Sequence, residues 1–167
     1  MVDFKEAEEG MNIYLVQHGN PVPKEEDPDR PLSAQGRIDV EKMASFLKRS
    51  GVRIEEVFHS KKTRARQTAE LIAAILNPGI TPMEKRGLSP MDDVQVIAEE
   101  LEQSEQDLML VGHLPHLARL SSFLITGGED KPVIRFQQGG VVCLKRDQEY
   151  KGWTIAWVLI PEILFPS

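Results

Sequence analysis

Two histidines stand just after short apolar runs, where side chains of α/β proteins often do chemistry. His18 follows the run at residues 13–16, and His113 follows the run at residues 108–111. Each run is closed by glycine and then proline, which is typical of a buried strand that enters a loop. Because binding crevices of open α/β sheets lie at the carboxyl ends of strands, the two imidazoles are predicted to share one site if their strands are neighbours.

A cationic segment lies between them in the sequence, at residues 60–68. It contains four basic side chains, Lys61, Lys62, Arg64 and Arg66. The segment joins a predicted strand that ends near His59 to a predicted helix that begins at Thr63. A helix N-terminus beside arginines favours anions, so the two histidines, an arginine and this helix end together predict a phosphate pocket. On charge alone, the alternative is the solvated face of a helix.

The elements that position these residues alternate along the chain. Strands are predicted at 12–16, within 52–59, at 80–84 and at 108–111. Helices are predicted after an N-cap at Ser33, at 63–76, at 92–103 and at 116–125, with Ile38 on the buried side of the first. Residues 133–136, 140–144 and 153–160 are predicted as further strands. This order predicts an α/β three-layer sandwich with a mainly parallel central sheet, helices on both faces and antiparallel C-terminal edge strands.

Composition restricts the classes of protein and partner. The chain has 167 residues, a net charge of −6, 41% hydrophobic and 28% charged residues, which is ordinary for a soluble globular protein. We expect an N-terminal extension at residues 1–10 and a single domain at 11–167. The acidic balance argues against nucleic acid, and no apolar stretch approaches the roughly 20 residues that span a bilayer. The acidic N-terminus and the single cysteine, Cys143, favour a reducing cytoplasm. No oligomeric state is indicated.

Metal and cofactor chemistry are not expected. The four histidines show no paired ligand spacing, and there is no cysteine pair for zinc. His59 and His116 flank the predicted site in sequence, and packing roles are favoured for both.

Taken together, these segments resemble the histidine phosphatase superfamily, also called the phosphoglycerate-mutase-like superfamily. Its first signature is Arg-His-Gly after the first strand, and its third is a late Gly-His. Its second signature, Ser-x-x-x-x-Arg-Ala-x-Gln-Thr, is matched by Ser60, Arg64, Ala65, Gln67 and Thr68. The family's Arg-Pro-Leu-Ser segment is matched within residues 30–36. The resemblance covers residues 12 to about 115. The small size and the continuation His113-Leu114-Pro115 point to the SixA-type phosphohistidine phosphatases.

The resemblance implies a role for each site residue, and the chemistry of the side chains agrees. His18 is the expected nucleophile, with a backbone carbonyl fixing its tautomer. Arg64 would grip phosphoryl oxygens, and a cationic His113 would stabilise the transition state. Gln17 and Gly19 are expected to bind phosphate, and Asn20, Arg66 and Asp93 are further candidates. Asp92 and Asp93 are candidate general acids, although acidic residues at a helix start also offset its dipole.

Gln17 departs from the family pattern, which usually has arginine there. A neutral donor gives hydrogen bonds about half as strong as a charged one, and losing one preorganised donor costs about 3–4 kcal/mol in a transition state. We therefore expect a slower phosphatase, or one in which Arg66 or Lys62 substitutes. The expected substrate is phosphohistidine on a signalling protein, such as a phosphotransfer domain or a histidine kinase. The alternatives are a small-molecule phosphomonoesterase and a non-catalytic module that binds phosphoproteins.

Overall fold

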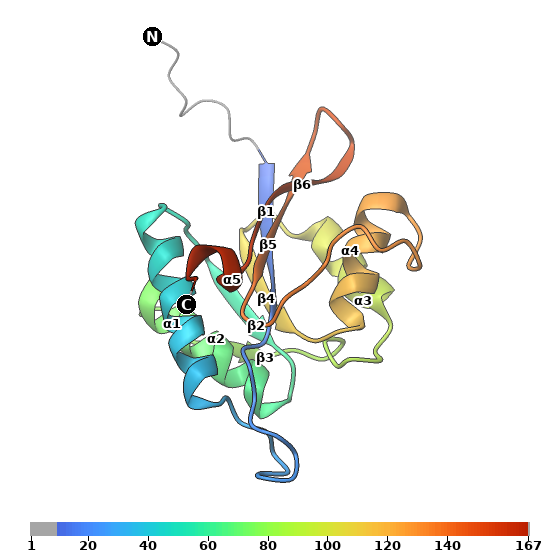
Figure 1. Ribbon diagram of the computed structural model, residues 1–167. Coiled ribbons are helices and arrows are strands. Elements are labelled where there is room, and N and C mark those ends of the chain that lie inside the picture. Colours follow the sequence, from blue (N-terminus) through green and yellow to red (C-terminus); the bar gives the residue numbers. More distant parts are fainter. Residues whose placement is uncertain (1–9, 167) are drawn as a thin grey trace.

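A single six-stranded sheet runs through the middle of the protein, with helices on both faces (Figure 1). The structure, a computed structural model, describes residues 10–166. Residues 1–9 of the predicted extension and residue 167 lie outside the described residues, and Gly10 already belongs to the first strand. The elements are β1 (Gly10–Gln17), α1 (Ala34–Arg49), β2 (Glu56–His59), α2 (Thr63–Leu76), β3 (Met83–Glu84), α3 (Val94–Gln103), β4 (Leu108–Gly112), α4 (His116–Thr126), β5 (Val141–Asp147), β6 (Gly152–Leu159) and α5 (Pro161–Leu164).

The strand order is β3-β2-β4-β1-β5-β6. The first four strands of this order pair in parallel, and β5 and β6 continue the sheet antiparallel. The predicted α/β sandwich with antiparallel C-terminal edge strands is confirmed. In the centre, β1 pairs with β4 in the register Gln17↔Gly112. The two strands that precede the histidines are therefore neighbours, and they end at the same edge.

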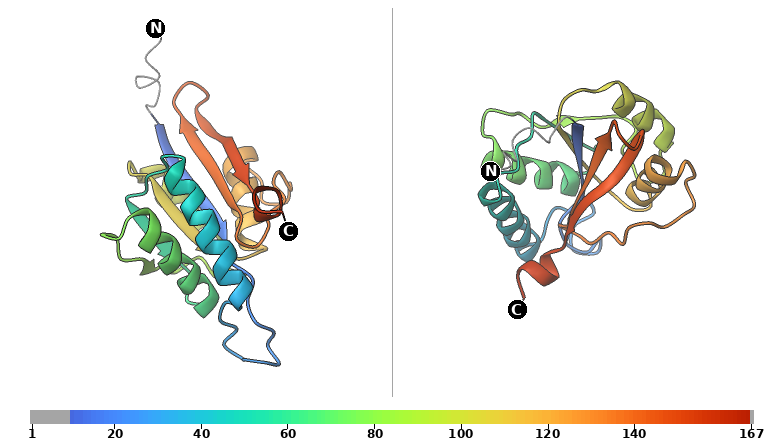
Figure 2. Two further views of the ribbon diagram at one scale, coloured as in Figure 1. Left: turned by 60° about the vertical axis from the view of Figure 1, so that its left-hand side comes forward. Right: turned by 90° about the horizontal axis from the view of Figure 1, so that it is seen from above.

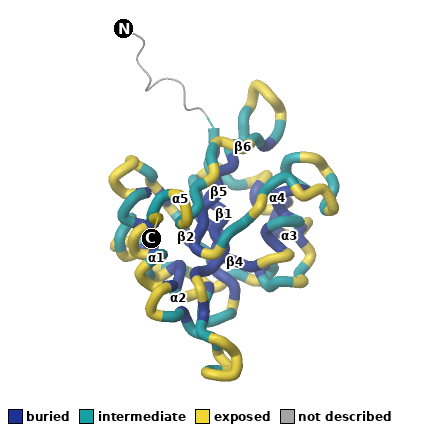
Figure 3. The backbone as a smooth tube through the Cα atoms, in the orientation of Figure 1, coloured by how far each residue is buried: buried dark blue, intermediate teal, exposed yellow. Residues whose placement is uncertain are grey.

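Two hydrophobic cores lie on opposite faces of the sheet. α1 and α2 cover one face, and α3 and α4 cover the other (Figure 2). Along β1, Tyr14 and Val16 contribute to the α1/α2 core, whereas Ile13 and Leu15 contribute to the α3/α4 core. A strand buried on both faces reads as a continuous apolar run, because successive side chains point to opposite faces. The central strands are accordingly buried over most of their length (Figure 3).

Three local expectations differ from the structure. Residues 133–136 form no strand, because Ile134 and Phe136 pack against the α3/α4 core instead of pairing in the sheet. Ile38 is 45% exposed because the buried stripe of α1 runs through Val40, Met43, Ala44 and Leu47. α3 begins at Val94 rather than at residue 92, since Asp93 is its N-cap.

No helix within residues 10–166 is long and apolar enough to cross a lipid bilayer.

Candidate functional site

Three chain exits meet at the carboxyl edge of the sheet. The backbone N–H of His18 donates to the carbonyl of Gly112 at 3.1 Å, and that of Ser60 donates to the carbonyl of Val111 at 3.2 Å. These bonds continue the β1–β4 and β2–β4 pairings beyond the strands. The rings of His18 and His113 lie side by side, with 4.9 Å between their centroids and 51° between their planes. The structure thus brings the two sequence-predicted imidazoles into one site.

Two hydrogen bonds fix the tautomer of His18. Its Nδ1 lies 2.7 Å from the carbonyl oxygen of Gly19, so Nδ1 carries the proton and donates it. On the other side of the ring, Arg64 Nε donates to His18 Nε2 at 3.3 Å. Because a guanidinium has no acceptor, Nε2 must hold a lone pair. The nitrogen that is free to attack an electrophile is therefore Nε2, and Arg64 lies against it.

The surroundings of His18 keep the ring neutral. Burial lowers its pKa to about 4; the hydrogen bond to Gly19 opposes this shift, while the positive charges of Arg64 and Arg30 add to it. The side chain is 6% exposed. At neutral pH the lone pair of Nε2 is consequently present in nearly every molecule, which is the state that a nucleophile needs.

His113 contacts Ser60, which lies between β2 and α2. The Ser60 hydroxyl and His113 Nε2 are 2.5 Å apart. Burial lowers the pKa of His113 to about 3, and the neighbouring cationic and histidine side chains act in the same direction. The ring is therefore neutral at pH 7 in this structure, in contrast to the cationic ring expected from the sequence. A negatively charged phosphoryl group would have to bind before His113 gained a proton, since the neighbours that oppose protonation are themselves positive.

The two arginines of the α2 segment behave differently. Arg64, in the first turn of α2, reaches His18. Arg66 is directed to solvent, where its Nε lies 3.8 Å from a carboxylate oxygen of Glu70 and both side chains are more than half exposed. Two positions along a helix correspond to about 200° of rotation, so the two residues lie on opposite faces. The structure brings Arg64 to the two histidines and leaves Arg66 outside.

α2 also holds the loop that follows His18. Thr68 Oγ1 accepts from the N–H of Gly19 at 3.0 Å and donates to the carbonyl of Arg64 at 2.8 Å. Gln67 Oε1 accepts from the N–H of Leu32 at 2.7 Å. In the sequence, Ser60, Gln67 and Thr68 stand out only as parts of a motif. The four-residue spacing of Arg64 and Thr68, which places both on one helix face, is a signal that could have indicated their place at one site.

The remaining candidates lie at the margin of this site. Gly19 is packed closely enough that a Cβ would lie 2.8 Å from Val40 Cγ2. Asn20 is exposed, and its carbonyl accepts from the N–H of Ser33 at 2.9 Å. Among the candidate acids, Asp93 Oδ1 accepts from the N–H of Gln95, and Asp92 Oδ2 accepts from the N–H of Ser89, both at 2.9 Å. Both carboxylates are therefore bound to the backbone at the start of α3.

Gln17 ends β1 immediately before the nucleophile. Its side chain is 9% exposed, and its Oε1 is buried without a hydrogen-bond partner. The backbone carbonyl of Gln17 accepts from the N–H of Gly139 at 2.9 Å. Buried polar atoms are nearly always paired, so this amide oxygen is an unusual feature.

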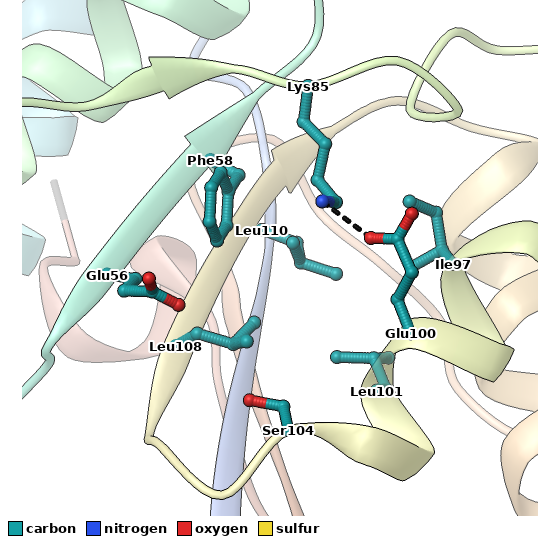
Figure 4. Close-up of a pocket in the computed structure, with 9 residues that line it drawn as sticks. All are labelled: Glu56, Phe58, Lys85, Ile97, Glu100, Leu101, Ser104, Leu108 and Leu110. Atoms are coloured by element: carbon teal, nitrogen blue, oxygen red, sulfur yellow. Dashed lines mark ion pairs between the residues drawn. The ribbon is translucent and has the colours of Figure 1, made fainter.

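Three cavities lie near this edge or below it. One of about 590 Å³ is lined by Lys61, Asp92 and Asp93, and one of about 270 Å³ is lined by Gly19 and Asn20, which follow His18. The smallest of the three, of about 120 Å³, lies between β2 and α3, where the 2.5 Å ion pair of Lys85 and Glu100 crosses an otherwise largely apolar lining (Figure 4). None of the three is lined by the histidine pair. No group of three potential metal-ligating side chains occurs in the part of the chain that the structure describes.

The neutral histidines make the stability of the fold depend on pH. Both have pKa values lowered from 6.5, to about 4 in His18 and about 3 in His113, so between pH 6.5 and these values the unfolded chain binds protons that the folded chain does not. We expect stability to be full above pH 6.5 and to fall as the pH drops, by roughly 1 kcal/mol per histidine at pH 5 after allowance for partial solvent contact. Urea unfolding at pH 7.5 and 5 measures this. The double variant His18→Gln/His113→Gln should lose less stability over that interval; an equal loss would contradict the assignment.

Comparison with known proteins agrees with this arrangement. The family model of the histidine phosphatase superfamily (branch 1) matches residues 13–107. An uncharacterised protein of Picosynechococcus sp. is 31% identical over 142 residues, covering 81% of this chain and 85% of that protein. The phosphohistidine phosphatase SixA of Escherichia coli is 28% identical over 156 residues, covering 90% of this chain and 94% of SixA.

Solved structures give the same result. A structure of the protein histidine phosphatase SixA complexed with tungstate has a TM-score of 0.81 and 27% identity, and covers 92% of this chain and 99% of that one. The α-ribazole phosphatase of Shigella flexneri shares the fold, with a TM-score of 0.73 at 16% identity over 90% of this chain and 97% of that one.

The sheet and the extent of the family match define the class of protein: the chain belongs to the histidine phosphatase superfamily, branch 1. The expected resemblance is thereby confirmed, and SixA proteins are among its relatives in both sequence and structure.

Proposed function

We propose that this protein is a phosphatase that acts through a phosphohistidine intermediate on His18 and removes phosphate from phosphohistidine of a signalling protein. One observation carries the proposal: the deprotonated Nε2 of a neutral His18 lies against the guanidinium of Arg64 and beside the ring of His113. A nucleophile, a bidentate cation and a second imidazole at one point are the groups that phosphoryl transfer requires.

In the proposed reaction, His18 Nε2 attacks phosphorus, and the bond between phosphorus and the leaving nitrogen or oxygen breaks. The leaving group takes the electron pair of that bond and a proton from solvent. Arg64 binds two of the phosphoryl oxygens, and His113 donates to a third once it has gained a proton. Water then attacks phosphorus and gives up a proton to solvent while the bond between phosphorus and Nε2 of His18 breaks; Nε2 keeps the electron pair of that bond as its lone pair, and inorganic phosphate leaves. No step uses a metal or another cofactor.

The relatives support the choice of substrate. SixA of E. coli is named a phosphohistidine phosphatase, and a SixA structure holds tungstate, a tetrahedral oxyanion like phosphate. An imidazole leaves phosphorus more readily than an alkoxide, so the engagement of Asp92 and Asp93 with backbone N–H groups matters less for phosphohistidine than for an ester. A phosphotransfer domain or a histidine kinase is the proposed partner. A cytoplasmic location is part of the proposal and is supported by the presence of a single cysteine in the sequence, since one cysteine cannot form a disulfide within the chain and so suits a reducing compartment.

Two other functions are alternatives to this proposal. The neutral amide in place of a cation favours a module that binds phosphoproteins without turning them over. A phosphatase for small phosphate monoesters would use the same His18, Arg64 and His113.

Phosphate release separates the three functions. The protein is incubated, with and without EDTA, with a phosphotransfer domain that carries phosphohistidine and, separately, with p-nitrophenyl phosphate. We expect EDTA-insensitive release, faster from phosphohistidine, and acid-labile phosphate on the protein after rapid quenching. Faster release from the ester would favour the phosphomonoesterase. Micromolar binding of the phosphoprotein without any release would favour the binding module.

A further inference from the structure

The two ring nitrogens of His113 have different surroundings. Nε2 lies 2.5 Å from the hydroxyl oxygen of Ser60, whereas Nδ1 is buried without a hydrogen-bond partner among residues 10–166. The whole ring lies beside that of His18, with 4.9 Å between the two centroids, so Nδ1 is at the candidate site whichever way it points. A buried polar atom left unpaired in a binding site indicates a ligand that supplies the partner.

Two elements fix the position of Ser60, which is fully buried. Its backbone N–H donates to the carbonyl of Val111 in β4 at 3.2 Å. Its hydroxyl oxygen accepts from the backbone N–H of Lys62, the N-cap of α2, at 3.3 Å. One lone pair of the hydroxyl is thus occupied by the start of α2, and the other lone pair and the hydrogen remain for His113.

Ser60 and His113 together have one hydrogen more than they can use. A neutral imidazole has one N–H and one lone pair, and a hydroxyl both donates and accepts. If Ser60 donates to Nε2, the ring hydrogen is on Nδ1; if Nε2 donates to Ser60, the hydroxyl hydrogen is left over. In both arrangements one hydrogen of the buried pair has no acceptor in the part of the chain that the structure describes. An oxygen of a phosphoryl group is such an acceptor.

We propose that Ser60 is a positioning residue that holds Nε2 of His113 in both protonation states of the ring and so makes Nδ1 the nitrogen that donates to the phosphoryl group. When the ring gains a proton, Ser60 accepts from Nε2 and Nδ1 carries the second hydrogen. A carboxylate at position 60 would only accept, an ammonium would only donate and alanine would do neither. The proposal rests on the proposed function, since it assigns the phosphoryl group to this site, and it deepens that function by naming the donor atom and the residue that sets it.

NMR of the histidine rings tests the assignment in the wild type without any turnover. The sequence has four histidines, and the spectrum of His113→Gln identifies the ring nitrogens of His113 in long-range ¹H–¹⁵N correlations. With saturating inorganic phosphate at pH 7, we expect a hydrogen on Nδ1 that exchanges slowly with water, while Nε2 keeps its contact with Ser60. A response at Nε2 alone, or at neither nitrogen although phosphate binds, would overturn the inference.

Ser60→Ala removes the partner of Nε2 and should change the pH profile of kcat on one side. The basic limb reports the cationic His113 in the complex, and losing a hydrogen bond to the charged ring lowers its pKa. We expect this limb to move to lower pH by about one pH unit and kcat/KM to fall roughly tenfold. The acidic limb reports the neutral His18 and should stay in place. Movement of both limbs would mean that the hydroxyl supports α2, whose Arg64 acts on His18, and would overturn the proposal.

Two further variants isolate the hydroxyl. Ser60→Thr keeps it and should restore kcat/KM to within about threefold; a shift of the basic limb equal to that of Ser60→Ala would show that the hydroxyl is not the cause. Ser121→Ala is the matched control, because it removes another buried hydroxyl, which donates to the carbonyl of Ala118 within α4 at 3.0 Å. This variant should move neither limb.

The other groups that act on His113 are unchanged in these variants. They are His18 after β1, Lys62 and Arg64 at the start of α2, and His116 at the start of α4. A shift confined to the basic limb therefore comes from the lost contact with Ser60.

The failure of this inference and the failure of the proposed function give different results. A wild type that releases phosphate from no substrate, but in which bound phosphate places a hydrogen on Nδ1, would contradict the catalytic function and leave the role of Ser60. A wild type that turns over phosphohistidine through His18, but in which phosphate acts on Nε2, would leave the catalytic function and contradict the role of Ser60. The NMR measurement keeps this distinction even if Ser60→Ala fails to fold.

Discussion

Replacing His18 with alanine is expected to reduce kcat for phosphohistidine by roughly 10⁴-fold or more, because the route through a covalent intermediate is lost with the nucleophile. Binding should survive, since Arg64, which contacts His18 Nε2 at 3.3 Å, remains to hold phosphoryl oxygens. The affinity for inorganic phosphate is therefore expected to change less than about tenfold. Rapid-quench labelling should find no acid-labile phosphate on the variant.

A second histidine provides the matched control. His59 is buried at the end of β2, and its Nδ1 lies 2.8 Å from the carbonyl of Ser60, the same local hydrogen bond that His18 makes to Gly19. His59→Gln removes a buried imidazole of similar setting two strands away in the sheet, and kcat should fall less than tenfold. Free imidazole should restore part of the turnover of His18→Ala, with phosphoimidazole as the first product, because the variant leaves space where the ring was.

Turnover by His18→Ala at more than about one hundredth of the wild-type rate would contradict the assignment of the nucleophile. Equal losses in His18→Ala and His59→Gln would show that the first loss was one of folding rather than of chemistry.

Much of the fold was predictable because burial imposes simple periodicities. β1 and β4 are buried on both faces, so they appear in the sequence as unbroken apolar runs, and α2 was placed at its observed bounds by its apolar stripe. Residues 133–136 have the composition of a strand, but Ile134 and Phe136 pack against the α3/α4 core instead of pairing in the sheet. Which of these two ways of burying apolar side chains is adopted depends on tertiary packing, and local composition contains no information about it.

The position of the candidate site was predictable from the sequence, whereas the protonation state of its histidines was less so. The rule that parallel strands end at one edge brought His18, His113 and the start of α2 together. The protonation of His113 depends on its depth and on the neighbouring cationic and histidine side chains, which come from three separate segments. Its contact with Ser60 is likewise tertiary, because the two residues are 53 positions apart in the sequence. The outward direction of Arg66 could have been derived from helical geometry, since it is two positions from Arg64.

Replacing Arg64 with lysine is expected to lower kcat/KM by about 10²–10³-fold although the charge is kept, because an ammonium cannot make two parallel hydrogen bonds to phosphoryl oxygens. Gln17 makes this loss more severe than it would be with arginine at both positions, since within residues 10–166 no second guanidinium hydrogen-bonds to the histidine pair. Steady-state kinetics with phosphohistidine measures the effect. Arg66→Lys is the comparison: with its side chain in solvent beside Glu70, kcat/KM should change less than threefold, and an equal loss would mean that Arg66 takes part after all.

A second readout separates a role at the site from a role in folding. The charge of Arg64 is one of the causes that lower the pKa of His18, after burial. Arg64→Ala removes that charge and leaves the ring buried, so the pKa of His18 should rise from about 4 towards 6.5 without reaching it. Arg64→Lys keeps the charge and should leave the pKa nearly unchanged while kcat/KM falls. NMR titration of the imidazole measures both. If the lysine variant lost activity and the pKa of His18 also rose, the loss would reflect a displaced helix α2 rather than the missing pair of guanidinium donors. That result would contradict the phosphate-binding role of Arg64.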